Sequence, residues 1–79
     1  MTVKALLKVD GEIRKDVRVD CDVKRGYCTG MITERNGYKL RLPQGSQKRI
    51  VLEDGQEFEI IVGSSKYYDT LVFISEPIK

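Results

Sequence analysis

The chain contains no histidine and no tryptophan, and it has only two prolines and two cysteines among 79 residues. Without an imidazole, the chain alone cannot build a Ser-His or Cys-His nucleophile pair or a histidine-based zinc site. The spacing of Cys21 and Cys28 fits neither a C-x-x-C redox motif nor half of a four-ligand zinc site. We therefore expect no enzyme activity, no metal and no cofactor. Both cysteines are interpreted as small buried hydrophobic residues, with a cross-strand disulfide as the alternative in an oxidising compartment.

Long hydrophobic runs are absent as well. No apolar stretch approaches the roughly 20 residues of a transmembrane helix, and 33% of the residues are charged. The first seven residues lack the apolar core and the small-residue cleavage site of a secretory signal. We therefore expect a cytoplasmic protein that does not enter a membrane. A chain of this length buries about 60–65% of its unfolded surface, so residues 1–79 are expected to form one domain with a thin core.

Apolar and polar residues alternate between closely spaced turn signals, which is typical of strands. The clearest strand places four apolar residues on one face: Val17, Val19, Cys21 and Val23. A turn is expected after it, at residues 24–26, and Pro77 should keep the C-terminal residues out of a sheet. The pattern predicts an all-β fold, a small antiparallel barrel or rolled sheet of about 5–7 short strands, SH3-like or OB-like. Closure would remove the exposed edges of a single sheet.

Asn36-Gly37 is the strongest hairpin signal, because both residues tolerate the positive φ that a type I′ turn requires. We predict that residues 27–34 pair with residues 38–42 around this turn. In that register Glu34 lies opposite Lys39, with opposite charges, and the neighbouring face is apolar, with Met31 opposite Leu42.

Two further turns follow the same logic. At Asp10-Gly11 we predict a three-residue connection that sets Val9 opposite Ile13 and Ala5 opposite Val17, because register follows the buried face. A turn at residues 54–55 should place Arg49 opposite Glu59 on the neighbouring strand. Residues 63–66 are expected to form an exposed loop. Residues 71–74 are continuously apolar, so the last strand is expected to be covered on both faces.

The net charge of +2 is unevenly distributed. Residues 24–49 contain seven basic side chains and one acid, a net charge of +6, whereas residues 1–23 are neutral and residues 50–79 carry −4. The basic part can bind a polyanion, it can be an ordinary solvated surface, or it can pair with the acidic part inside the fold. We predict the first of these, with DNA or RNA as partner. The predicted nucleic-acid-binding residues are cations for the phosphates and tyrosines for base stacking: Lys24, Arg25, Tyr27, Arg35, Tyr38, Lys39 and Arg41.

A protein-interaction or inhibitory accessory module, of the kind that phages encode, is the alternative. Its contact would be the strand edge of residues 71–74, which could accept another strand, or the neighbouring pair Tyr67-Tyr68. The competing interpretation of the tyrosine pair is an anchor for its own loop. An uncovered edge strand would also allow a homodimer.

A third interpretation comes from a family resemblance. Residues 14–18 read Arg-Lys-Asp-Val-Arg and lead into a barrel-like pattern, and in both respects the chain resembles PilZ-type cyclic dinucleotide receptors. The resemblance implies a cyclic dinucleotide ligand. The family also has a D/N-x-S-x-x-G turn, and residues 32–37, which end at Gly37, lack both the acid or amide and the serine.

Overall fold

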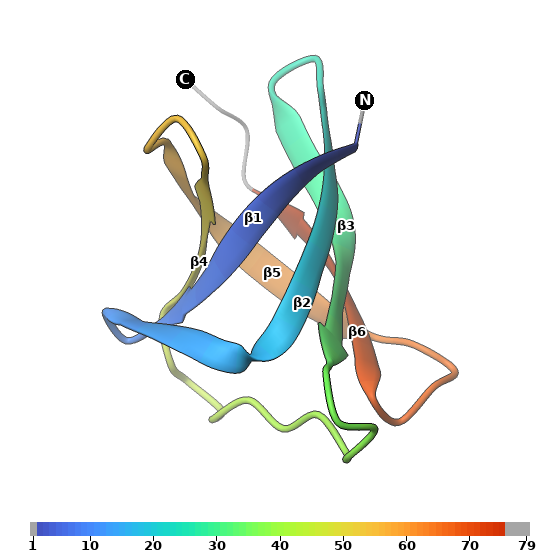
Figure 1. The fold of residues 1–79 in the computed structure, drawn as a ribbon. Coiled ribbons are helices and arrows are strands. Elements are labelled where there is room, and N and C mark those ends of the chain that lie inside the picture. Colours follow the sequence, from blue (N-terminus) through green and yellow to red (C-terminus); the bar gives the residue numbers. More distant parts are fainter. Residues whose placement is uncertain (1, 76–79) are drawn as a thin grey trace.

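The computed structural model describes residues 2–75 and contains six antiparallel strands. They are β1 (Thr2–Val9), β2 (Glu12–Lys24), β3 (Tyr27–Glu34), β4 (Lys48–Leu52), β5 (Glu57–Ser64) and β6 (Thr70–Ser75). The strands close into a barrel in the order β1-β2-β3-β6-β5-β4, since β1 pairs with both β2 and β4 (Figure 1). The predicted all-β barrel is thus confirmed, whereas the expectation for Pro77 falls outside the described residues. Within residues 2–75, nothing has the length and apolar character of a membrane-crossing helix.

Side chains from all six strands fill the barrel. Leu7, Ile32 and Ile50 are completely buried at its centre, and the predicted inward face of β2 is confirmed except at Val23, which is exposed near the strand end. The two cysteines are buried and unpaired, as interpreted from the sequence. Burial is the main cause that raises the pKa of Cys21 to about 12, and a hydrogen bond with the Cys28 thiol is the second.

The β1–β2 hairpin differs from the prediction at its turn. Asp10 and Gly11 both have positive φ, 48° and 85°, and form a two-residue connection with Val9 opposite Glu12. The predicted three-residue connection is therefore wrong. Farther along, the β1–β2 register shifts between Ala5 and Leu7, so that Ala5 lies opposite Val19 and an apolar pair forms there.

The hairpin predicted at Asn36-Gly37 is wrong. At the β2–β3 turn, Arg25 and Gly26 both take positive φ, as a type I′ turn requires, whereas in the Asn36-Gly37 pair only the glycine does. Residues 38–47 form no strand. The partner of β3 is β6, so Met31 lies opposite Val72 and not opposite Leu42, and Glu34 does not pair with Lys39. We call residues 35–47 the crossing segment, because they pass over one end of the barrel between β3 and β4 (Figure 1).

The second half of the chain follows the prediction in part. Arg49 lies opposite Glu59, as expected. β5 continues to Ser64, so the predicted loop at residues 63–66 begins later than expected. β6 pairs with β3 on one side and β5 on the other, which leaves no free edge at residues 71–74. The prediction that both its faces are covered is also wrong: Val72 and Ile74 lie on the outer wall and are exposed, because a barrel buries only alternate residues of a strand.

A close approach of two backbones gives the fold a sharp test. A Cβ at Gly30 would lie 2.0 Å from the carbonyl oxygen of Asp20, whereas a Cβ at Gly63 would meet only a methyl group of Val72 at 3.4 Å. We expect Gly30→Ala to lower the free energy of unfolding by about 3 kcal/mol or more, because the backbone must move. Gly63→Ala should change it by less than about 1 kcal/mol. Chemical denaturation of both variants checks this, and equal stabilities would contradict the described β2–β3 packing.

Candidate anion-binding groove

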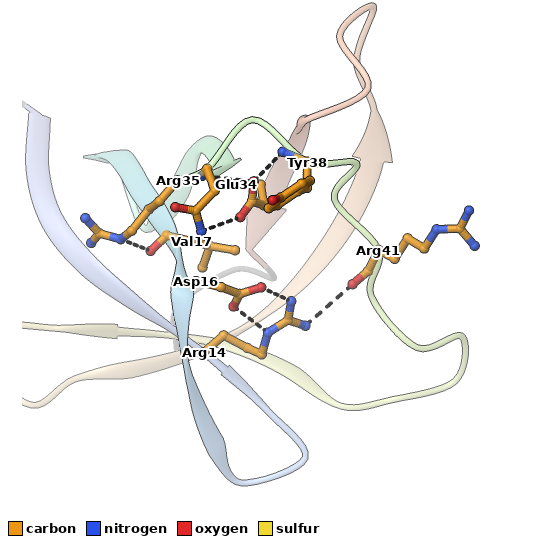
Figure 2. Close-up of polar contacts among 8 residues, drawn as sticks. Arg14, Asp16, Val17, Glu34, Arg35, Tyr38 and Arg41 are labelled. Carbon is orange, nitrogen blue, oxygen red and sulfur yellow. Dashed lines mark hydrogen bonds and ion pairs between the residues drawn. The ribbon is translucent and has the colours of Figure 1, made fainter.

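The crossing segment is set in place by the carboxylate of Glu34. This side chain is buried, at 6% exposure, and its Oε2 accepts hydrogen bonds from the backbone N–H groups of Asn36, at 3.0 Å, and Tyr38. Its Oε1 accepts a third, at 3.2 Å, from the side-chain amide of Asn36 (Figure 2). A buried carboxylate needs donors of this kind. The turn after β3 therefore wraps around Glu34 and does not fold back into a hairpin.

Tyr68, in the loop between β5 and β6, provides the next attachment. Its hydroxyl donates to the carbonyl oxygen of Gly37 at 2.7 Å, and its own carbonyl accepts a hydrogen bond from Leu40 N–H at 3.0 Å. The ring itself remains exposed. Tyr68 therefore anchors the crossing segment. The competing interpretation had Tyr67-Tyr68 anchor their own loop to the core.

Arg14 of β2 provides a third attachment for the segment. Its guanidinium donates to both carboxylate oxygens of Asp16, at 2.8 and 2.6 Å, and to the carbonyl oxygen of Arg41 at 3.5 Å (Figure 2). The Arg14 hydrogen bonds lower the pKa of Asp16 below its ordinary value. The carbonyl oxygen of Asp16 also accepts a hydrogen bond from Arg35 N–H at 2.9 Å.

With these attachments, the segment has an inner and an outer side. Leu40 is buried and Leu42 packs against the core, whereas Lys39 and Arg41 are exposed. Neither of these two cationic groups has a hydrogen-bond or ion-pair partner within residues 2–75. By contrast, the Lys48 ammonium donates to two carbonyl oxygens of the crossing segment, at 3.2 and 3.1 Å, and so serves to hold the segment.

A groove of about 750 Å³ runs between the crossing segment and the β5–β6 wall. Lys39 and Arg41 lie along it, and aliphatic side chains contribute an apolar lining: Leu40, Leu42, Ile60, Ile61, Val62 and Leu71. The groove exists because β4 pairs with only the first residues of β5. Beyond them, the crossing segment takes the place of a strand without pairing.

The other predicted site residues lie elsewhere. Lys24, Arg25 and Tyr27 belong to the β2–β3 turn and its edge, at the opposite end of β3 (Figure 1). A strand of this length separates the two ends by roughly 20 Å. The structure therefore brings Lys39 and Arg41 together but keeps them apart from the residues of the turn.

Arg35 and Tyr38 have different surroundings again. The guanidinium of Arg35 points away from that of Arg41 in Figure 2, and its Nε donates to the carbonyl oxygen of Val17 at 3.0 Å. Arg35 lines a separate cleft beside β1. The Tyr38 ring is 71% exposed, so it is accessible for stacking, while its backbone is held by Glu34.

The two arginines of residues 14–18, on which the resemblance to PilZ-type receptors rests, also have different surroundings. Arg14 holds the crossing segment through Asp16 and the Arg41 carbonyl, whereas Arg18 forms an ion pair of 3.2 Å with Asp20 and lines the cleft beside β1. For Glu34, the sequence pattern predicts only a cross-strand charge pair and not the anchoring role. One feature of the sequence sets Glu34 apart: it is the only acid among residues 24–49.

The outer wall of the barrel carries an apolar patch on β3, β6 and β5. It consists of two cross-strand pairs, Met31 with Val72 and Ile61 with Ile74. Their exposed fractions range from 38% for Val72 to 62% for Ile61, so the patch is open to solvent over three adjacent strands.

No family model, curated protein or solved structure matches the chain. No cluster of three or more histidine, cysteine or acidic side chains that could hold a metal occurs among residues 2–75.

The role of Glu34 can be tested with two variants. Glu34→Ala removes the acceptor of two backbone N–H groups, and we expect a loss of about 2–3 kcal/mol in the free energy of unfolding, with faster amide exchange at Asn36 and Tyr38. Glu34→Gln keeps one carbonyl oxygen, which can still accept both backbone hydrogen bonds, so its loss should be smaller. Hydrogen exchange by NMR measures both effects, and unchanged exchange in Glu34→Ala would refute the anchoring role.

Proposed function

We propose that this protein is a non-enzymatic module that binds a polyanion, nucleic acid in the first place, along the groove beside the crossing segment. The proposal rests on the exposure and the position of the cationic groups of Lys39 and Arg41. Both are exposed, lie on the groove and have no partner among the described residues. Cations that already form ion pairs would have to give them up on binding, whereas these two do not.

The spacing of the two cations supports a backbone contact. Alternate residues of an extended chain lie roughly 6–7 Å apart on the same side, a spacing of the same order as that between successive phosphates of a nucleic-acid strand. The segment that carries them is already fixed by Glu34, Tyr68 and Arg14. Binding therefore requires little additional ordering of the backbone, which favours affinity. The exposed Tyr38 ring, next to Lys39, is available to stack on a base.

Fluorescence anisotropy with labelled single- and double-stranded oligonucleotides at two salt concentrations tests the proposal. We expect binding that weakens as salt rises. The double variant Lys39→Gln/Arg41→Gln should bind about 10-fold more weakly or worse, and its slope of log K against log salt should be shallower by about 1.4–1.8.

The matched control is Lys24→Gln/Arg25→Asn, which removes the same charge at the other end of the barrel. Asparagine is chosen because Arg25 has a φ of 48°, which asparagine tolerates. This control should bind like the wild type. Equal losses in the two double variants would indicate a diffuse electrostatic effect, and no binding of any oligonucleotide at low salt would remove the proposal.

The apolar patch favours a second candidate function, a protein contact. Because β6 is paired on both sides, strand addition at residues 71–74 is not its basis. The patch is instead a face that a second copy of the chain could cover with its own identical patch, as in an isologous dimer.

Light scattering after size-exclusion chromatography tests this second candidate. We expect a dimer that Ile74→Lys converts to a monomer, because a lysine would place a charge in the centre of the apolar contact. Leu6→Lys is the matched control, since Leu6 is similarly exposed, at 51%, but lies on β1 outside the patch. A wild-type monomer at high concentration would rule out the dimer.

A further inference from the structure

A second cavity shares no lining residue with the proposed nucleic-acid groove. It is a cleft of about 470 Å³ over β1, the middle of β2 and the end of β4, a size that is typical of small-molecule sites. It lies where the β1–β2 register shifts, between Ala5 and Leu7. Irregular pairing of this kind, of which the β-bulge is the common form, is over-represented next to functional sites.

The charges around the cleft leave one positive charge in excess. The lining contains the cations Lys4, Arg18 and Arg35 and the carboxylates Asp20 and Glu53. Arg18 and Asp20 neutralise each other in an ion pair of 3.2 Å. Lys4 and Arg35 have no acidic partner within residues 2–75. The surplus matches a ligand with a single negative charge.

Arg35 is oriented for a planar anion. Its Nε donates to the carbonyl oxygen of Val17 at 3.0 Å, which fixes the guanidinium. The N–H groups of its two terminal nitrogens have no acceptor among residues 2–75. Figure 2 shows these nitrogens on the side of Arg35 away from Val17. Two parallel N–H donors of this kind match the two oxygens of a carboxylate.

Apolar side chains form the rest of the lining. Leu6 on β1 lies opposite Val51 on β4, and Leu6 is about half exposed, at 51%. Both line the cleft together with Ala5, Val19 and Leu52. A ligand that covers these side chains needs an apolar body as well as an anionic group.

We propose that this cleft binds a small carboxylic acid with an apolar body, its carboxylate on the terminal nitrogens of Arg35 near Lys4 and its body against Leu6 and Val51. The proposal is independent of nucleic-acid binding, because the cleft does not include Lys39 or Arg41.

NMR titration with 3-phenylpropionate tests the site. We expect saturable shifts of the backbone amides of Leu6, Val19 and Val51, with a dissociation constant on the order of 1 mM for a probe of this size. Two further probes separate the two parts of the ligand: 3-phenylpropanol lacks the charge and acetate lacks the apolar body. Each should bind at least 5-fold more weakly. Equal binding of the alcohol would overturn the anionic site, and phenyl phosphate binding more tightly than the carboxylate would replace the carboxylic acid by a phosphate ester.

Three variants complete the test. Arg35→Met should weaken 3-phenylpropionate at least 5-fold, and Arg35→Lys should be intermediate, because a lysine keeps the charge but not the paired donors. Lys4→Met removes a cation of the cleft without affecting the hydrogen bond to Val17, and it should weaken binding even if Arg35→Met fails to fold. Lys24→Met, at the far end of β2, is the control and should bind like the wild type. Unchanged affinity in Lys4→Met and in a folded Arg35 variant, or shifts confined to other parts of the barrel, would overturn the proposal.

Discussion

The buried carboxylate of Glu34 determines the course of the basic part of the chain. A carboxylate at 6% exposure requires hydrogen-bond donors. Two residues that follow closely in the chain, Asn36 and Tyr38, provide them. The chain therefore leaves β3 around Glu34 and crosses the end of the barrel. Because that path is fixed, Leu40 fills the core while Lys39 and Arg41 remain on the outer side. The same turn directs Arg35 toward a different cleft from Arg41.

Barrel closure is the second constraint, and it places the remaining surfaces. Because β6 has a neighbour on both sides, it offers no free edge for strand addition, and the barrel puts every second side chain on the outside. The apolar pairs on β3, β5 and β6 are exposed for this reason. The pairing within the closed barrel is interrupted beside Ala5, where the β1–β2 register shifts and one cleft lies. It also stops short along β5, beyond its pairing with β4, and the groove lies there.

The sequence predicted features that depend on neighbouring residues. The strands, the inward face of β2 and the pairing of Arg49 with Glu59 follow from alternation and from local turn residues. The hairpin predicted at Asn36-Gly37 does not form, because the turn wraps around the Glu34 carboxylate. Partners distant in sequence reinforce that path: Glu34 N–H donates to the carbonyl oxygen of Asp69, and Leu40 N–H donates to that of Tyr68. The charge pattern identified residues 24–49, but β3 within that range divides its cations between the two ends of the barrel. Only the tertiary fold could show that division.

We propose that the crossing segment, held by Glu34, presents Lys39 and Arg41 to a nucleic-acid strand. The most direct measurement is an NMR titration of the labelled wild-type protein with a short single-stranded oligonucleotide, followed at every backbone amide. We predict that the shifts concentrate on residues 38–48 and on Ile61 and Val62 across the groove. Shifts concentrated on residues 24–27, or no shifts at low salt, would contradict the account.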